Sequence, residues 1–348
     1  MPHPETWLKP LPQGLYCEPG GFFIDPVRPV ERAVITHGHS DHSRAGHDGV
    51  IASTATLAII RARLGAGAGR SQQALAWGES IRIGDIRLWL QPAGHVLGSA
   101  QVAMEYQGSR AVVSGDYKRA WDPTCDGFVP IPCDVFVTEA TFALPVFRHP
   151  DAADEIQRLL HSVLLFPERT HAVGCYSLGK CQRVIAMLRR AGWDRPIYLH
   201  GAMAAMCEVY KAQGVALGEL RPATVAAKAD LRGAMVLAPP GAIADRWVNR
   251  LTEPVVAMAS GWMQVRQRAR ARGVELPLVI SDHADWPALL STIEEVGAPE
   301  VWVTHGREDA LIHALELRGV RGRALRLLGY GDDDGVEDEL VLNAEGVV

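Results

Sequence analysis

Short apolar runs separated by turn-forming residues dominate the first part of this 348-residue chain. The apolar residues on either side of Gly84 and Asp85 form the two arms of a predicted hairpin. A second predicted hairpin joins residues 101–105 to residues 110–114 across Gly108. The chain up to about residue 142 is therefore predicted to consist mainly of strands, with few helices.

From about residue 151 helical periodicity alternates with apolar runs. The helical stretches cover residues 153–166, 180–191 and 202–212, and the apolar runs cover residues 171–175, 196–199, 235–238 and 255–259. Alternation of this kind predicts a parallel sheet with crossover helices. After about residue 272 the order returns to strand, helix, strand, so the α/β segment is predicted to be an insertion into the first domain.

A dense group of metal-ligand residues follows one of the early apolar runs. His37, His39, Asp41 and His42 stand directly after residues 33–35. Imidazole nitrogens and a carboxylate are donors that zinc or manganese accepts. Four donors so close in sequence do not easily reach one ion, but they can serve two ions about 3.5–4 Å apart. The alternative is a chance His cluster on a surface turn with weak metal affinity.

Three further donors each come at the end of an apolar run. They are His95 after residues 86–90, Asp116 after residues 110–113, and His305 after residues 301–303. Strand ends that face one edge of a sheet are where such a site assembles. The sequence therefore predicts that the early cluster is completed by donors from later strands.

With these residues the chain resembles the metallo-β-lactamase superfamily, whose pattern is HxHxDH, then a lone His, an Asp and a final His. The resemblance implies an α/β fold, the αββα metallo-β-lactamase sandwich. It also implies two divalent metal ions, zinc or manganese. The implied ligands are His37, His39 and His95 for one metal, Asp41, His42 and His305 for the second, and Asp116 as the bridge. A carboxylate that bridges two cations offsets their mutual repulsion.

Further segments resemble the nucleic-acid-processing branch of this superfamily, the β-CASP nucleases. Glu139 stands where that branch has an acidic residue, and His283 stands in its Ser-x-His-x-Asp context. Residues 176–182 are similar to its Ser-x-Gly-Arg-x-Gln stretch, with Lys180 where Arg is commoner. The resemblance implies a smaller α/β β-CASP cap domain at residues 144–273, inserted between two parts of the metallo-β-lactamase domain, residues 1–143 and 274–348.

The same resemblance implies catalytic roles for four residues, Asp41, Asp116, Glu139 and His283. His283 is predicted to protonate the leaving oxygen, with Glu139 orienting it. The alternative for His283 is a structural role, capping the helix that begins near Asp285. Substrate contacts are predicted mainly in the cap, where a helix start favours phosphate; the candidates are Ser177, Gly179, Lys180, Ser260 and Gly261. Trp262 either stacks on a base or packs in the core.

Within the branch the chain looks most like the bacterial ligase-associated DNA exonucleases, a group also named mRNA 3′-end processing factors. This implies a DNA exonuclease acting in repair, associated functionally with an ATP-dependent DNA ligase and a helicase. An RNA nuclease of the same fold stays open, because several DNA-directed relatives carry Val where this chain has His305. The more distant alternatives are a small-molecule metallo-hydrolase, a class that lacks the inserted cap, and a non-catalytic nucleic-acid-binding subunit, against which the complete ligand set argues.

The net charge of −5 at first argues against a protein that holds a polyanion. Six acidic residues near the end of the chain account for it: Asp332, Asp333, Asp334, Glu337, Asp338 and Glu339. We interpret this tail as a solvated segment, although acidic tails can also mimic nucleic acid. The start of the chain does not have the pattern of a signal peptide, and no apolar segment is long enough to span a bilayer, so a cytoplasmic location without membrane contact is expected. The six cysteines show no C-x-x-C pair and are expected to be reduced rather than metal ligands.

Overall fold

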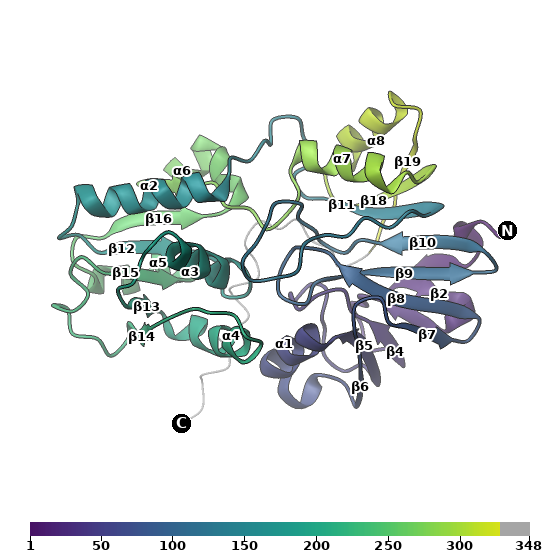
Figure 1. Ribbon diagram of the computed structural model, residues 1–348, viewed down its shortest axis with the longest axis horizontal. Coiled ribbons are helices and arrows are strands. Elements are labelled where there is room, and N and C mark those ends of the chain that lie inside the picture. The colour runs from purple at the N-terminus through teal and green to yellow at the C-terminus, as the bar shows by residue number, and fades with distance from the viewer. Residues whose placement is uncertain (328–348) are drawn as a thin grey trace. The chain divides into compact units, whose positions relative to one another are not determined.

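The computed structural model describes residues 1–327 of the chain, which form two compact units (Figure 1). One unit comprises Met1–Arg148 together with residues 283–327, and the other is His149–Asp282. The insertion is predicted at residues 144–273. The second unit of the structure begins and ends a few residues later, at His149 and Asp282. The predicted acidic tail lies outside the described residues.

Two sheets build the first unit. The first sheet has the order β1-β2-β3-β4-β5-β6, and the second has the order β19-β18-β11-β10-β9-β8-β7. The strands of the first sheet are β1 (Leu8–Leu11), β2 (Gly14–Cys17), β3 (Phe22–Ile24), β4 (Arg32–Val34), β5 (Gly49–Ser53) and β6 (Ser71–Leu75). The strands of the second sheet are β7 (Ser80–Ile83), β8 (Ile86–Pro92), β9 (Ala100–Tyr106), β10 (Ser109–Val113), β11 (Val135–Ala140), β18 (Glu300–Gly306) and β19 (Arg321–Ala324).

One hydrophobic cluster lies between these two sheets. It combines Phe22 and Ile24 of the first sheet with Leu88 and Val102 of the second, all fully buried. Helix α1 (Thr54–Leu64) packs on the outer face of the first sheet, where its apolar residues join those of β4 and β5. Helices α7 (Trp286–Val296) and α8 (Glu308–Glu316) cover the outer face of the second sheet. The layers are helix, sheet, sheet, helix, which confirms the predicted αββα sandwich.

Both predicted hairpins are present in the second sheet. Strands β7 and β8 pair antiparallel around Gly84 and Asp85, and β9 and β10 pair antiparallel around Gly108. Helix α1 is one that the sequence analysis did not predict. Its start is set by Ser53, whose hydroxyl accepts the N–H of Thr56 at 3.1 Å.

The second unit contains a six-stranded sheet with the order β14-β13-β15-β12-β16-β17, in which every pairing is parallel. Its strands are β12 (His171–Gly174), β13 (Ile197–Leu199), β14 (Leu220–Pro222), β15 (Met235–Ala238), β16 (Val255–Ala259) and β17 (Leu276–Leu278). Its helices are α2 (Ala152–Leu165), α3 (Lys180–Arg190), α4 (Gly201–Ala212), α5 (Pro240–Ala244) and α6 (Arg266–Ala271). The alternating pattern of the sequence correctly predicts this parallel α/β arrangement.

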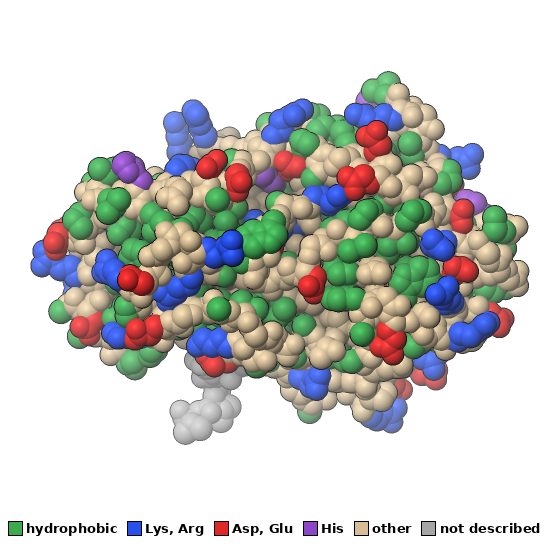
Figure 2. Space-filling model, viewed as in Figure 1, with side chains coloured by type: hydrophobic (Ala, Val, Ile, Leu, Met, Phe, Trp, Pro, Cys, Tyr) green, Lys and Arg blue, Asp and Glu red, His purple; other side chains and the backbone are tan. Residues whose placement is uncertain are grey.

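Short 3₁₀ helices complete the described chain. They are η1 (Pro4–Thr6), η2 (Glu18–Gly20), η3 (Gly65–Gly67), η4 (Arg246–Arg250) and η5 (Gly261–Gln264). Within residues 1–327 we find no helix with the length and apolar character that a bilayer crossing requires. Basic and acidic side chains are interspersed on the face of the molecule that Figure 2 shows. The six cysteines are all free thiols, as the sequence predicts.

Candidate metal centre

The first four donor residues lie on one turn that follows β4. The N–H groups of His42 and Ser43 both donate to the carbonyl oxygen of His39, at 3.3 and 2.8 Å. This turn folds the segment back on itself. As a result, the ring centroid of His37 lies 5.0 Å from that of His39 and 4.1 Å from that of His42. The spacing of the sequence motif therefore produces a cluster of imidazole rings.

His95 and Asp116 come from loops that follow strands of the second sheet. The hydroxyl of Ser99 shapes the first loop, because it accepts the N–H of His95 at 3.0 Å. Gly115 lets the second loop approach the first sheet. Its φ is +56°, and a Cβ at this position would lie 2.7 Å from the Cβ of Thr36. Asp116 follows directly and is buried.

His305 lies at the end of β18 rather than beyond it, and its backbone has an unusual conformation. Its φ of +57° is in the left-handed region. The next residue, Gly306, has a φ of +125°, and a Cβ there would lie 2.3 Å from the carbonyl oxygen of Ala140. This local geometry accompanies a stacked arrangement of the His305 and His42 rings, with centroids 5.6 Å apart.

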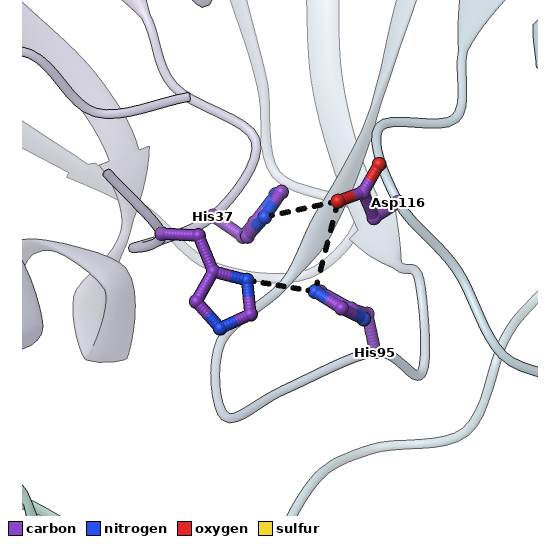
Figure 3. Close-up of side chains that lie close together, drawn as sticks. His37, His95 and Asp116 are labelled. Atoms are coloured by element: carbon purple, nitrogen blue, oxygen red, sulfur yellow. Dashed lines mark hydrogen bonds and ion pairs between the residues drawn. The ribbon is translucent and has the colours of Figure 1, made fainter. Parts of the chain in front are cut away.

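One oxygen of Asp116 is the point at which several donors converge (Figure 3). Oδ2 of Asp116 lies 3.4 Å from Nε2 of His37, 3.4 Å from Nε2 of His42 and 3.8 Å from Nε2 of His95. Nε2 of His95 also lies 2.9 Å from Nδ1 of His39. The structure thus brings residues from three separate segments together at the carboxylate of Asp116.

The donor atoms form overlapping groups in which all atoms lie within 4.8 Å of one another. One group consists of His37, His39, His95 and Asp116, a second of His42, Asp116 and His305, and a third of His37, Asp41 and His42. Asp116 belongs to the first two groups. It is therefore shared between two sets of atoms that could each hold a metal ion.

Several buried atoms of this cluster that could bind a metal have no hydrogen-bond partner within residues 1–327. They include Nε2 of His37, Oδ1 of Asp41 and Oδ1 of Asp116. A buried polar atom without a partner is rare and costly, and a metal ion would satisfy each of these atoms. Imidazole nitrogens with carboxylate oxygens are a donor set that zinc and manganese accept. The cluster is therefore suited to binding divalent metal ions.

The charges of the cluster lead to the same conclusion. Burial lowers the pKa of His37 well below its ordinary value, and neighbouring His42 lowers it further. Burial raises the pKa of Asp116, but His42 and His305 outweigh this effect and hold the pKa well below its usual range. Burial lowers the pKa of His42, but Asp41 and Asp116 outweigh it and raise the pKa well above 6.5. The ionised carboxylates thus attract positive charge, which a divalent cation also supplies.

Asp25 is a site residue that the sequence analysis missed. One of its oxygens accepts the N–H of Thr36 at 2.7 Å. The other lies 2.6 Å from the Thr36 hydroxyl, which donates to it, and 2.8 Å from Nδ1 of His42. A carboxylate on Nδ1 fixes the ring so that Nε2 faces the cluster. Asp25 directly follows β3, so the strand-end rule that found the other donors was a signal for it as well.

Arg63 of α1 is a second residue that sequence reasoning missed. Its guanidinium donates to the carbonyl oxygen of Gly38 and, at 2.8 Å, to the hydroxyl of Ser43. The Ser43 hydroxyl in turn donates to the carbonyl oxygen of His39 at 2.8 Å. These bonds hold the ligand turn from its outer side. No sequence signal found Arg63, because it belongs to a helix that was not predicted.

His283 and Glu139 form a hydrogen-bonded pair next to the cluster. Nδ1 of His283 lies 2.9 Å from Oε2 of Glu139, and the His283 and His95 rings lie 4.6 Å apart. Glu139 is buried, and its Oε1 accepts the N–H of Tyr117 at 2.8 Å. The cap of helix α7 is Asp285, whose side chain accepts the N–H of Ala288 at 3.1 Å. His283 is therefore engaged by Glu139 while Asp285 carries out the capping.

All five predicted phosphate contacts lie in the second unit, and the polar groups of Ser177, Gly179 and Lys180 are bonded within it. The N–H of Gly179 donates to Oε1 of Gln182 at 2.8 Å, and Gln182 Nε2 donates to the carbonyl oxygen of Ser177 at 2.8 Å. Lys180 is buried, and its ammonium lies 2.8 Å from Oδ2 of Asp282. The charge of Lys180 is thus paired with a buried carboxylate, and its contact with phosphate stays a prediction.

The remaining predicted contacts, Ser260 and Gly261, lie at the start of η5. The Ser260 hydroxyl accepts the N–H of Trp262 at 3.3 Å, and Gly261 is buried. The guanidinium of Arg268 covers the Trp262 ring, 4.2 Å from its centroid. The Ser260 side chain thus caps the start of η5 with a hydrogen bond inside the protein.

Comparisons with known proteins find a family similarity over part of the chain. Residues 25–170 match the metallo-beta-lactamase superfamily. The chain is 29% identical to "Probable DNA ligase" of Opitutus terrae over 95% of this chain and 32% of that protein. It is 24% identical to "Ribonuclease TTHA0252" of Thermus thermophilus over 89% of each chain. It is also 29% identical to "Endoribonuclease YSH1" of Gibberella zeae over 39% of this chain and 17% of that protein.

The chain therefore spans about a third of the length of the ligase relative. Among solved structures it is similar to a protein of unknown function from Enterococcus faecalis V583, with a TM-score of 0.55 and 15% identity. That alignment covers 85% of this chain and 79% of the other. A likeness at this identity concerns the fold alone.

Proposed function

We propose that the chain is a two-metal phosphodiesterase of the β-CASP nuclease type, because residues 25–170 match the metallo-beta-lactamase superfamily. We propose further that it is an exonuclease acting on DNA during repair. The observation that carries the proposal is the convergence of donors on Oδ2 of Asp116, beside a His283–Glu139 pair at 2.9 Å. Phosphodiester cleavage needs cations that offset the phosphate charge and a nearby group that donates a proton to the leaving oxygen.

The ligand assignment follows the groups of donor atoms that contain Asp116, and the family resemblance adds Asp41, which is grouped with His37 and His42. His37, His39 and His95 would hold one ion, His42, His305 and Asp41 the other, and Asp116 both. When bound, two divalent ions supply Lewis acidity and offset the negative charge of the phosphate. Zinc and manganese both fit this donor set.

Side chains of the protein would orient the attacking water and protonate the leaving oxygen. Asp41 has a buried oxygen without a hydrogen-bond partner within residues 1–327, and it would orient the attacking water as well as bind metal. Glu139 accepts the Nδ1 proton of His283, so the second ring proton would be carried on Nε2. From there His283 would protonate the leaving oxygen, which is a poor leaving group as an alkoxide.

The choice of DNA rests on the relatives. The relative named "Probable DNA ligase" aligns with 95% of this chain and extends well beyond the match. A nuclease and a ligase joined in one protein would act on the same strand ends. We therefore propose an ATP-dependent DNA ligase as a functional partner. The helicase stays a prediction from the family resemblance.

An RNA nuclease is the second candidate. The relative named "Ribonuclease TTHA0252" matches this chain over 89% of both lengths, and the YSH1 relative is named an endoribonuclease. The ligand cluster and the His283–Glu139 pair would serve either nucleic acid. The 2′-hydroxyl is distinguished by contacts to the substrate rather than by the metal site.

The test compares single-stranded DNA and RNA of one sequence, end-labelled and incubated with the protein and zinc or manganese. We expect progressive shortening of DNA, and no shortening by the Asp116→Ala variant. Asp48→Ala is the matched control, because the Asp48 carboxylate is half exposed and pairs with Arg70 at the surface. This control should cleave like the wild type.

The outcomes separate the proposals. Preferential cleavage of RNA would replace the DNA assignment by the second candidate. Wild-type rates in Asp116→Ala would contradict the metal model of catalysis. If the metal-loaded wild type cleaves neither nucleic acid, the proposed function itself fails.

A further inference from the structure

Trp121 stands apart from the other tryptophans of the chain. All nine tryptophans lie within the described residues, and eight of them are buried or half-buried. The Trp121 side chain, in contrast, is 61% exposed. Tryptophan is among the most buried residue types on average, so the exposed indole requires an explanation.

The backbone on both sides of Trp121 is fixed by buried contacts. The ammonium of Lys118 pairs with Oδ2 of Asp122, and both side chains are 3% exposed. Oδ1 of Asp122 accepts the N–H and the hydroxyl of Thr124, at 2.8 and 2.6 Å. The ion pair closes a short turn from Lys118 to Asp122, and Trp121 stands inside that turn.

Arg119, in the same turn, is held by helix α7. Its guanidinium donates to the hydroxyl of Thr292 at 3.0 Å and to Glu295 at 2.7 Å. Of the side chains between the paired Lys118 and Asp122, the large aromatic one faces solvent and the charged one is tied down. This is the reverse of an ordinary surface loop, in which the arginine would be expected to face water.

The turn is also anchored to the candidate metal centre. The N–H of Lys118 donates to the carbonyl oxygen of Ala93 at 3.1 Å, two residues before His95. Gly94 fits closely here: its φ is +77°, and a Cβ there would lie 2.4 Å from the carbonyl oxygen of Lys118. Trp121 is five residues beyond Asp116, so their Cα atoms are at most about 18 Å apart.

We propose that Trp121 is a stacking platform for a nucleobase of the bound strand, a few nucleotides from the phosphate at the metal centre. This inference rests on the proposed function, since it assigns a contact to the nucleic-acid substrate. An indole offers a large flat π-face, and bases stack on such faces with little regard to sequence. The buried contacts on both sides of Trp121 hold its backbone in place, so the backbone loses little conformational freedom when the strand binds.

The test measures kcat and KM of Trp121→Ala, Trp121→Phe and the wild type on a single-stranded oligonucleotide and on the same oligonucleotide with abasic sites. We expect Trp121→Ala to raise KM about 10-fold or more on the normal strand, with kcat within about 2-fold of wild type. Trp121→Phe should stay near the wild type. Leu317→Ala is the control for truncation of an exposed side chain, because Leu317 is 74% exposed.

The abasic strand separates stacking from a structural role. It has no base to stack, so the wild type and Trp121→Ala should have the same KM on it. Equal losses on both strands, or no loss on the normal strand, would overturn the proposal. Binding of the labelled strands is also measured by fluorescence anisotropy, which needs no cleavage. Base-dependent binding by Trp121 without cleavage would leave this inference standing while the proposed function fails.

Discussion

Replacing Asp25 with Asn is the sharpest test of how the metal centre is organised. The side chains have the same shape, and Asn tolerates the left-handed backbone of this position, where φ is +42°. The amide oxygen can still accept the N–H of Thr36, which lies 2.7 Å from Oδ1. The amide NH₂ then replaces the oxygen that lies 2.8 Å from Nδ1 of His42. Nδ1 must become an acceptor, and the ring proton moves to the nitrogen that faces the metals.

The magnitude follows from this exchange of tautomers. The wild type makes a charge-assisted hydrogen bond to His42, a class worth about 1.5–3 kcal/mol. The variant loses that bond in the metal-bound state, since Nε2 must be unprotonated to bind an ion. At 1.4 kcal/mol for each factor of ten, we expect the affinity for one ion to fall by about 10- to 100-fold. The affinity for the ion held by His37, His39 and His95 should fall less, because the Asp25 oxygen that the exchange replaces lies directly beside the His42 ring.

Competition with a chromophoric zinc chelator measures both affinities, and mass spectrometry under native conditions counts the ions. Asp48→Asn is the control, an identical exchange at a half-exposed carboxylate. Two ions bound as tightly by Asp25→Asn as by the control would refute the reasoning. An equal weakening of both ions would show instead that Asp25 shapes the whole ligand turn.

Three further changes test other parts of the first unit. Lys118→Met should lower the free energy of unfolding by about 3–5 kcal/mol in urea titrations, because it leaves the buried Asp122 carboxylate without its cation. The control Lys9→Met breaks an exposed ion pair and should lower the free energy of unfolding by under about 1 kcal/mol. Gly306→Ala should reduce zinc binding and stability together, because its Cβ would lie 2.3 Å from a backbone oxygen at a φ of +125°; an unchanged melting temperature would contradict this. Burial raises the pKa of the Cys133 thiol to about 12, so iodoacetamide at pH 8 should modify it far more slowly in the native protein than in urea.

The sequence was most informative where chemistry requires particular atoms at a fixed spacing. His37, His39 and His42 could be found because only a few residue types donate to metals and a short turn must carry them. Sheet class was also predictable, since the alternation of helical and apolar segments in residues 151–272 specifies parallel pairing. These signals are local, and each can be recognised in a segment of a few tens of residues.

Groups that hold the ligands in place carry no such signal. Arg63 reaches the ligand turn from α1, and Lys118 holds its loop through an ion pair with Asp122. Any residue with a suitable donor could fulfil such a task from many positions in the chain. Only the tertiary structure reveals which residue does so. Helix α1, which carries Arg63, was itself not predicted.

Lys180 shows how a familiar segment can carry a different physical role. Its similarity to a Ser-x-Gly-Arg-x-Gln stretch led to the prediction of a phosphate contact, for which the loss of a guanidinium fork would matter. In the structure the ammonium pairs with Asp282 at 2.8 Å, and Arg183 lies 3.4 Å from the other oxygen of the same carboxylate. A buried carboxylate needs positive charge more than bidentate geometry when an arginine already contacts it. The ammonium of Lys180 thus shares the Asp282 carboxylate with Arg183, and the phosphate contact of this segment stays a prediction.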